Sequence, residues 1–300
     1  MDSREQITTV GDDLLVLAPA KLNLSLLIAG KRSDGFHEIE TVMAKIDWYD
    51  EVFIQPAFGA GIELICDGPQ WAPAGQENLV YRAAERLLES CGLANDVRIK
   101  LTKNIPAGTG LGSASSDAAA ALIGINRYFE LGLGKKDLCK LAAELGSDVA
   151  FFLNGPLAFC TGKGEKITNL DEIFNFTAFL ILPDVSVSTK EVYANYRHNR
   201  QLYEKLNIQI KDHICKNRID LLVKMCANML AGSCFDLEKN LAELKKTIES
   251  FGFGPCCLSG SGSAMFCIIE SGDEDKTMES MHKLADKIGC KSIIVRNNRW

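Results

Sequence analysis

The stretch Pro106-Ala107-Gly108-Thr109-Gly110-Leu111-Gly112-Ser113-Ala114-Ser115-Ser116 comes after a strand-like segment, 97–101, and leads into an alanine-rich helical segment. Glycines let a backbone approach a ligand closely and adopt positive φ angles. Successive backbone N–H groups that end on a helix N-terminus form a cradle for phosphate, and serine hydroxyls add donors, one of which could contact magnesium. The alternative is a tight turn whose serines only cap the helix. Three alternating glycines with three serines after them favour the phosphate loop.

The type of phosphate loop can be narrowed from the residues after its glycines. A Walker A loop needs Lys and then Ser or Thr after the last glycine, and a Rossmann loop needs a further glycine. Here Ser113 comes directly after Gly112, so neither pattern is met. The HRD and DFG elements of protein kinases are also absent from the sequence. An ATP site of another type remains.

Composition excludes several classes of protein. The chain has 300 residues, 47% of them hydrophobic, and a formal net charge of -6. A chain of this length can bury most of its apolar surface without disulfides, and its acidic balance argues against a nucleic-acid partner. Its eleven cysteines lie mostly in apolar runs and lack the paired CxxC spacing of zinc sites, so no metal ligands are assigned. With neither an apolar N-terminal segment nor a membrane-length apolar run, the sequence predicts a cytoplasmic protein without a membrane partner.

Hydrophobic periodicity predicts strands mainly in the first half of the chain and helices mainly in the second. A domain boundary is expected near residues 165–180. The expected strands include two around Pro19 within 14–28, then 37–46, 51–55, 61–66, 97–101 and 151–159. The expected helices are 79–91, 115–132, 136–145, 189–203, 214–230, 237–251 and 274–288.

Two further motifs accompany the phosphate loop. Ala18-Pro-Ala-Lys21-Leu-Asn23-Leu lies near the N-terminus, and Leu258-Ser-Gly260-Ser-Gly262-Ser lies near the C-terminus. In this order the three motifs resemble the GHMP kinase superfamily, which includes galactokinase and the homoserine, mevalonate and phosphomevalonate kinases. Gly30-Lys-Arg-Ser-Asp34-Gly35-Phe36-His37-Glu38-Ile39 narrows the resemblance to the branch that phosphorylates the 2-hydroxyl of 4-diphosphocytidyl-2-C-methyl-D-erythritol in non-mevalonate isoprenoid biosynthesis. Further matching segments are 78–84, 143–149, 161–165 and 183–189.

The resemblance implies an α+β protein with the two-domain GHMP-kinase fold. Residues 1–170 would form an N-terminal, ATP-binding β/α domain similar to ribosomal protein S5. Residues 171–300 would form a C-terminal, ferredoxin-like α+β domain that contributes to the substrate site. ATP and substrate would meet in the cleft between the two domains, and Mg²⁺ would accompany ATP. The oligomeric state is not predicted.

The resemblance also implies roles for single residues. Lys21 and Asp148 would be the catalytic pair: Lys21 lowers the pKa of the acceptor hydroxyl and neutralises developing charge, and Asp148 is the general base. Asn23 would contact a hydroxyl or a phosphate beside Lys21. Asn78 and Lys103 match positions around the adenine end of ATP.

The small-molecule partner would be a cytidine diphosphate-linked methylerythritol. His37 would hydrogen-bond its cytosine, Thr189 would lie at the substrate site, and Phe36 and Tyr193 would sandwich the base. Phe36 stands where the branch usually has tyrosine, and Tyr193 stands where it usually has phenylalanine. Two other departures are Ser113-Ala114 in place of loop glycines and Ala150 in place of a proline.

Other functions are weighed against this one. Another GHMP kinase, such as a homoserine or mevalonate kinase, would have no use for the segment Asp34-Gly-Phe-His37. A non-catalytic nucleotide sensor would need neither Lys21 nor Asp148. A dinucleotide-dependent oxidoreductase would need the missing Rossmann glycine and an acidic residue about twenty positions on.

Overall fold

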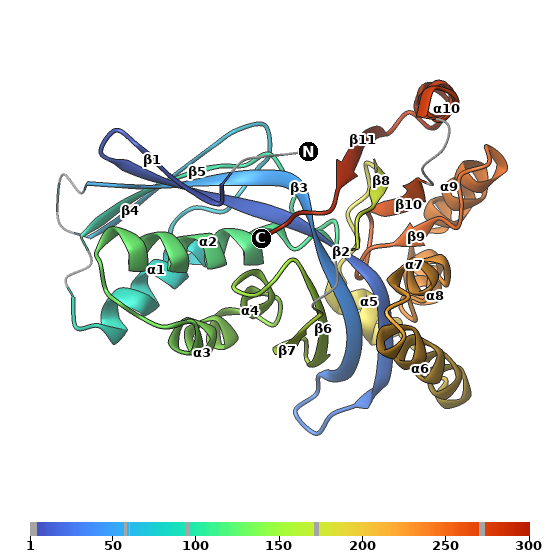
Figure 1. Cartoon of the computed structure of the whole chain (residues 1–300), viewed down its shortest axis with the longest axis horizontal. Helices are drawn as coiled ribbons and strands as arrows, with labels where there is room; N and C mark the ends of the chain where they lie inside the picture. The colour runs from blue at the N-terminus through green and yellow to red at the C-terminus, as the bar shows by residue number, and fades with distance from the viewer. Residues whose placement is uncertain (1–4, 57–58, 60, 94–95, 171–173, 270–273) are drawn as a thin grey trace.

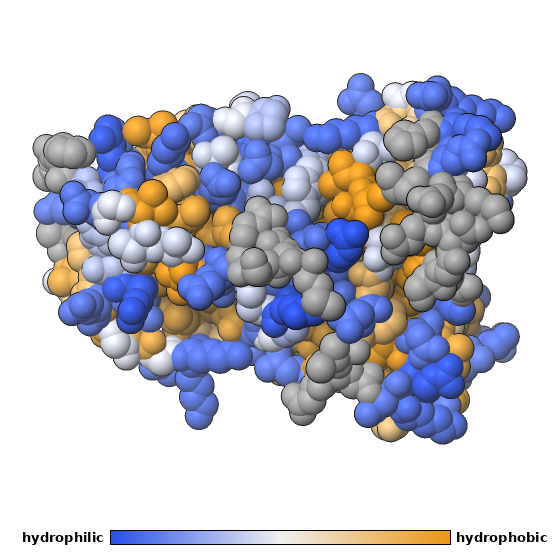
Figure 2. Space-filling model, turned by 45° about the horizontal axis from the view of Figure 1, so that its top comes forward, coloured by the Kyte–Doolittle hydropathy of each residue, from blue (hydrophilic) through white to orange (hydrophobic). Residues whose placement is uncertain are grey.

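The computed structural model describes residues 5–56, 59, 61–93, 96–170, 174–269 and 274–300. Two β-sheets lie side by side, each with its own helices, and a long hairpin runs between the two halves (Figure 1). Figure 2 shows hydrophilic residues over most of one face, with hydrophobic residues in small groups between them. Within the described ranges, no helix is long and apolar enough to cross a membrane.

The first sheet is built on an antiparallel pair of 19-residue strands, β2 (Asp13–Lys31) and β3 (His37–Gln55). Its strand order is β1-β2-β3-β5-β4, and β6 pairs with the first half of β3 and with β7. β4 and β5 are parallel and are joined by a helix, as parallel neighbours require. The remaining strands are β1 (Ile7–Val10), β4 (Ile62–Asp67), β5 (Val97–Thr102), β6 (Leu157–Gly162) and β7 (Lys166–Asn169).

Both long strands are continuous where the sequence predicts breaks. Proline has no N–H to give to a ladder, and the β2–β3 register shifts between Pro19 and Lys21. Pairing resumes beyond the shift, so the proline interrupts the ladder without ending the strand. In β3 the expected gap at 47–50 is also strand, and Tyr49 and Asp50 are buried there.

Four helices cover one face of the first sheet (Figure 1). Their buried stripes pack on one another and on the strands, and Ala83 and Leu87 lie on the buried stripe of the first of them. The expected strand 151–159 is wrong in its first part, since residues 149–152 form a short helix and the strand begins only at Leu157. The helices are α1 (Leu79–Ser90), α2 (Ser113–Tyr128), α3 (Lys135–Leu145) and α4 (Val149–Phe152), and α1 is preceded by the 3₁₀ turn η1 (Gly75–Glu77).

The second sheet is antiparallel, with strand order β11-β8-β10-β9. Along the chain a strand, several helices, two strands, a helix and a last strand succeed one another, which is the ferredoxin-like arrangement. The α+β prediction is therefore confirmed. The strands are β8 (Thr177–Leu182), β9 (Cys257–Leu258), β10 (Met265–Ile269) and β11 (Lys291–Arg296). The helices are α5 (Thr189–Asn195), α6 (Arg200–Cys215), α7 (Ile219–Lys224), α8 (Ala231–Leu237), α9 (Lys239–Ser250) and α10 (Glu274–Ile288).

Two helices that periodicity alone predicts as longer are divided in the structure. The expected helix 189–203 is two helices, because Asn199 accepts a hydrogen bond from the backbone N–H of Leu202 at 3.0 Å and starts α6. The expected helix 214–230 also fails, since α6 ends at Cys215 and the short α7 comes next.

The hydrophobic core beneath the second sheet draws on the long hairpin as well. Leu22 and Ile28 of β2 belong to the same buried cluster as Phe179 and Phe266 of the second sheet. Backbone hydrogen bonds join the two regions: Leu26 N–H donates to Ala227 O at 2.7 Å, and Met229 N–H donates to Leu26 O at 2.9 Å. The hairpin is therefore common to both halves of the molecule.

Candidate active site

A cavity of about 360 Å³ lies where the two halves meet. The phosphate loop lines it from Pro106 to Ser115, and residues of both sheets and their loops complete the wall. The other lining residues are Lys21, Asn23, Leu26, Ile39, Thr41, Gly146, Ser147, Asp148, Lys163, Thr189, Tyr193, Gly260 and Ser261. The three motifs thus meet around one space.

The phosphate loop uses its glycines for conformation and for close packing. Gly108, Gly110 and Gly112 all have φ angles between 71° and 79°, a region that favours glycine. A Cβ on Gly110 would lie 2.1 Å from the carbonyl oxygen of Ser259, so the loop tip rests directly on the C-terminal glycine-rich turn. Ser259 Oγ donates to Gly110 O at 2.9 Å and holds the two segments together.

The loop serines are not used to cap helix α2. Gly112 is the N-cap residue, and no side chain caps the helix. Ser113 and Ser115 line the cavity, whereas Ser116 is buried beneath the loop and outside the lining. This arrangement leaves backbone N–H groups and two hydroxyls facing the cavity, as a phosphate cradle requires.

Lys21 and Asp148 face each other across the cavity. Lys21 Nζ lies 3.8 Å from Asp148 Oδ2, and the lysine side chain is 4% exposed while the aspartate side chain is 32% exposed. Burial lowers the pKa of Lys21, and the charge of Asp148 opposes that shift. Asp148 is the N-cap residue of α4, yet its side chain makes no capping bond, so the carboxylate is available to a ligand.

Asn23 holds the Lys21 ammonium in place. Its Oδ1 accepts a hydrogen bond from Lys21 Nζ, and its Nδ2 donates to Thr41 Oγ1 at 2.8 Å. The Lys21 backbone N–H donates to Leu111 O at 2.9 Å, which ties β2 to the phosphate loop. The lysine is thus fixed at both its backbone and its side chain.

The residues predicted to bind the base fall into two groups. Thr189 and Tyr193 line the cavity, and Thr189 Oγ1 forms a 2.8 Å hydrogen bond with Ser261 Oγ. Phe36 and His37 do not line it but lie beside residues that do: the His37 ring centroid is 5.2 Å from that of Tyr193, and the ammonium of Lys163 is 4.7 Å from the Phe36 ring centroid. Phe36 is 57% exposed.

Burial perturbs the two titratable rings of this region in opposite senses. It raises the pKa of the Tyr193 phenol, to which the charge of Asp148 adds. Burial lowers the pKa of His37, and the nearby Lys31 and His198 contribute to the shift. Each ring is therefore favoured in its neutral form, which suits contact with an uncharged base.

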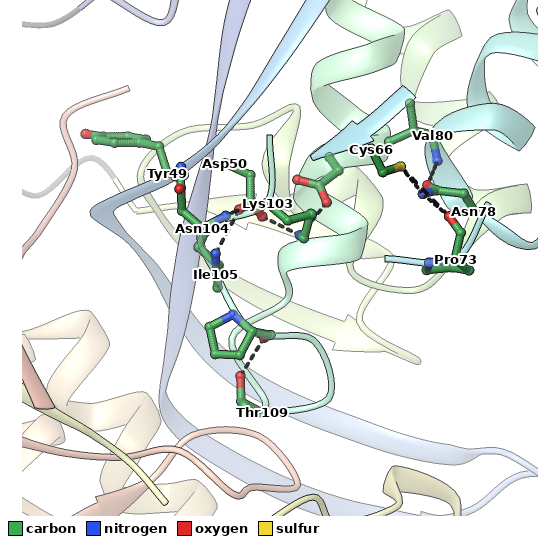
Figure 3. A network of polar contacts seen from close by, with 12 residues as sticks. Tyr49, Asp50, Cys66, Pro73, Asn78, Val80, Lys103, Asn104, Ile105 and Thr109 are labelled. Atoms are coloured by element: carbon green, nitrogen blue, oxygen red, sulfur yellow. Dashed lines mark hydrogen bonds and ion pairs between the residues drawn. The ribbon is translucent and has the colours of Figure 1, made fainter. Parts of the chain in front are cut away.

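Asn78 and Lys103 do not line this cavity. Figure 3 shows the polar contacts that their side chains make. Asn78 Oδ1 accepts from Val80 N–H at 2.9 Å and Nδ2 donates to Pro73 O at 2.8 Å, so this side chain caps helix α1. The ammonium of Lys103 is buried between two carboxylates. Both side chains thus make structural contacts, and their contacts with ATP stay a prediction.

The cavity also contains functional groups that the motifs do not single out. Lys163 contributes a cation, and Thr41 contributes a hydroxyl. The segment 161–165 is part of the resemblance, but a lone lysine in it carries no role by sequence alone. Glu165 Oε2 accepts from the Lys163 backbone N–H at 2.5 Å and fixes the turn that presents the cation.

No group of three His, Cys, Asp or Glu side chains able to hold a metal ion occurs within the part of the chain that the structure describes. A magnesium ion bound to a nucleotide needs only one or two protein oxygens, because phosphates and water complete its shell. The Ser115 hydroxyl beside the phosphate loop fits that need.

Comparison with known proteins agrees with this geometry. The family model of the GHMP kinases N terminal domain matches residues 78–156, and that of the GHMP kinases C terminal matches residues 210–286. A crystal structure of 4-(cytidine 5'-diphospho)-2C-methyl-D-erythritol kinase superposes with a TM-score of 0.74 at 30% identity, covering 95% of this chain and 100% of that one. A homoserine kinase from Cytophaga hutchinsonii superposes with a TM-score of 0.75 at 21% identity, covering 99% of this chain and 98% of that one, and so shares the fold.

Sequence relatives narrow the family within the GHMP kinases to which the chain belongs. The 4-diphosphocytidyl-2-C-methyl-D-erythritol kinase of Bacillus cytotoxicus is 36% identical over 256 residues, which are 85% of this chain and 88% of the relative. That of Chloroherpeton thalassium is 39% identical over 280 residues, which are 89% of this chain and 94% of the relative. The chain belongs to the GHMP kinases and, within them, to the family of the 4-diphosphocytidyl-2-C-methyl-D-erythritol kinases.

Proposed function

We propose that this protein transfers the γ-phosphoryl group of ATP to the 2-hydroxyl of 4-diphosphocytidyl-2-C-methyl-D-erythritol. The observation that carries the proposal is the Lys21–Asp148 pair, 3.8 Å apart, in a cavity walled by the phosphate loop. A kinase needs a base for the hydroxyl proton and a cation for developing charge, both within reach of the phosphate cradle.

Asp148 and Lys21 have complementary parts in the transfer. The acceptor hydroxyl gives its proton to the Asp148 carboxylate, its oxygen forms the new bond to the γ-phosphorus, and the bond from that phosphorus to ADP breaks. Burial lowers the pKa of Lys21, and the charge of the neighbouring Asp148 carboxylate opposes that shift and so favours the ammonium form. Its ammonium stabilises the negative charge that develops on the acceptor oxygen and the transferred group.

The loop 106–116 holds the triphosphate through backbone N–H groups and through the hydroxyls of Ser113 and Ser115. Mg²⁺ would be bound by the phosphates and by the Ser115 hydroxyl. When present, it neutralises phosphate charge. Asn23 keeps the Lys21 ammonium directed into the site.

We assign the cytidine end of the substrate to the rim of the cavity, which we define as Phe36, His37 and Tyr193. Tyr193 and Phe36 offer aromatic faces on which a base can stack, and the His37 ring lies beside Tyr193. Lys163 lines the cavity with its ammonium 4.7 Å from the Phe36 ring centroid, and it offers a cation to the diphosphate. A homoserine or mevalonate substrate would use none of these rim residues.

Two broader proposals accompany this one. A division near residue 170 into an N-terminal ATP-binding domain and a C-terminal domain is supported by the two separate sheets, although β2 and β3 contribute to both cores. A cytoplasmic location is supported by the cysteines, all of which are free thiols.

The test is an assay of ADP released by the purified protein with magnesium and ATP. Turnover is expected with the cytidylyl substrate and not with homoserine or mevalonate. ³¹P NMR of the product should show a new phosphomonoester and an unchanged diphosphate. Turnover with homoserine or mevalonate alone would replace the proposal with another GHMP kinase activity, and ATP binding without any turnover would favour a nucleotide sensor.

A further inference from the structure

Next to the phosphate loop lies a buried ionic network of Asp50, Lys103 and Asp117. Figure 3 labels Asp50 and Lys103, together with Asn104 and Ile105, which lead into the loop. Lys103 Nζ is 2.7 Å from Asp117 Oδ2 and also forms an ion pair with Asp50. The three side chains are 0–3% exposed. They come from three regions of the chain, since Asp50 lies in β3, Lys103 lies just after β5 and Asp117 lies in α2.

The network holds both ends of the loop. Asp50 Oδ1 accepts from the backbone N–H groups of Asn104 at 2.6 Å and Ile105 at 2.8 Å, and Ile105 immediately precedes the loop. Asp117 is the first residue after it. We propose that Asp50, Lys103 and Asp117 are positioning residues for ATP: together they fix the two ends of the loop 106–116, and so set the direction of the N–H groups that bind phosphate.

The network acts through the loop and not by contact with ATP. None of its three side chains lines the cavity. Other contacts secure the loop tip, namely Ser259 Oγ to Gly110 O and Ala264 N–H to Thr109 O at 3.0 Å. The tip is thus held from the second half of the molecule and the ends from the first. A cradle made of backbone N–H groups depends on both, because its donors cannot be aimed by side-chain rotation.

Charge balance distinguishes the two carboxyl groups. Two carboxylates and one ammonium would leave a net negative charge in a buried site, which is costly. Asp50 accepts from two backbone N–H groups and from Lys103. Asp117 Oδ2 accepts from the Lys103 ammonium, and its Oδ1 has no hydrogen-bond partner among the described residues. Burial also raises the pKa of Asp117. Asp117 is therefore the carboxyl group whose neutral form is favoured, and asparagine, which is neutral and of similar shape, is its natural replacement.

Two substitutions at this one position test the proposal. Asp117→Asn keeps an acceptor for Lys103 and adds a donor in place of the acid proton, whereas Asp117→Leu fills a similar volume without either. MgATP affinity is measured by isothermal titration calorimetry without the second substrate. The Asn variant should stay within about twofold of the wild-type Kd, and the Leu variant should bind about tenfold more weakly, since small misplacements of binding groups have effects of this size or larger.

Steady-state kinetics separate positioning from general damage. In the Leu variant the KM for ATP should rise while the KM for the cytidylyl substrate stays unchanged, because that substrate does not contact the loop ends. Loss of folded protein would lower the total rate and leave both KM values unchanged. Lys100→Met, which removes an exposed lysine of β5, is the control and should change neither constant.

Equal MgATP affinities for the Asn and Leu variants would overturn the proposal. Should Asp117→Leu not fold, Asp50→Asn is the second measurement, since it keeps the volume but weakens the acceptor of Asn104 and Ile105. An unchanged Kd in that variant would also overturn it. The inference rests on the proposed ATP site but not on the acceptor: wild-type protein that binds MgATP without phosphorylating the cytidylyl substrate would contradict the proposed function and leave this inference standing.

Discussion

Lys21 Nζ lies 3.8 Å from Asp148 Oδ2, although one residue belongs to a long strand and the other begins a four-residue helix. At this separation the two charges interact without the close contact that would occupy both groups. Asn23 Oδ1 accepts one hydrogen bond from the Lys21 ammonium, and the Asp148 carboxylate stays partly exposed to solvent. An acceptor hydroxyl can therefore approach both groups together.

Asp148→Asn should abolish turnover while leaving MgATP affinity within about twofold. The amide keeps the shape of the side chain but cannot accept the hydroxyl proton, and general-base catalysis contributes on the order of 10²–10⁴-fold. Single-turnover kinetics and calorimetry measure the two effects. Asp137→Asn, in the exposed ion pair with Lys140, is the matched control. Retained turnover in Asp148→Asn would remove this residue from the base role.

Phe36→Ala should raise the KM for the cytidylyl substrate with little effect on the KM for ATP. Stacking on an aromatic ring is worth about 1–3 kcal/mol per base, or about 5- to 150-fold in affinity. Trp71→Ala removes an aromatic ring that is 75% exposed and absent from the cavity lining, and it should change neither constant. If the substrate KM is unchanged in Phe36→Ala, the base binds elsewhere.

Lys163→Met should weaken binding of the cytidylyl substrate more at low salt than at high salt. The ammonium lines the cavity, and its attraction for a diphosphate is screened as ionic strength rises. The KM is measured at two salt concentrations and compared with that of Lys166→Met, which removes an exposed lysine of the next strand. The same KM change in both variants would rule out a local contact by Lys163.

Gly110→Ala should disrupt the phosphate loop, whereas Gly132→Ala should only lower stability. Both glycines have positive φ angles, of 79° and 67°, which cost a non-glycine residue about 1–2 kcal/mol. An added Cβ meets Ser259 O at 2.1 Å in the first case and nothing within 4 Å in the second. Thermal unfolding and MgATP titration compare them. Normal MgATP affinity in Gly110→Ala would show that the loop tip can move away from the turn.

Lys45→Met should change how stability depends on pH. Lys45 is buried in β3, and its ammonium donates to Phe152 O at 3.1 Å and Asn154 O at 2.7 Å. Burial, with Lys135 nearby, lowers the pKa of Lys45 from 10.5 to about 7. Between these values the unfolded chain holds a proton that the folded protein lacks, so stability should rise with pH by up to about 1.4 kcal/mol per pH unit.

Urea unfolding between pH 7 and pH 10 measures this slope. The Lys45→Met variant should lose this rise of stability with pH, because methionine has no proton to release. Lys136→Met, which removes an exposed lysine of α3, should keep it. A wild-type slope that survives Lys45→Met would assign the released proton to another group.

The functional motifs are predictable because each depends on a local constraint. The glycines of the phosphate loop adopt φ angles that few other residues tolerate. Their positions in the sequence therefore predict where the backbone has positive φ. Lys21 and Asp148 are a predictable pair only through resemblance, since nothing local links a residue of β2 to the start of α4.

The errors have tertiary causes. Pro19 marks a register shift and not an end, because the surrounding strands impose pairing on both sides of it. Residues 149–152 are as apolar as a buried strand, and periodicity cannot separate a buried helical turn from one. The ion pair of Lys103 with Asp50 could not be read from the neighbouring residues, because Asp50 comes from another strand.

The shared β2–β3 hairpin limits how the cavity can open. A hinge between the two sheets would have to bend two continuous strands, break the hydrogen bonds of Leu26 to Ala227 and Met229, and separate one joint core. The hairpin packs into the cores of both halves, so it resists bending between them. We therefore expect ligands to enter by side-chain movements at the mouth, such as that of Lys163 over Phe36, and not by the closing of one half upon the other.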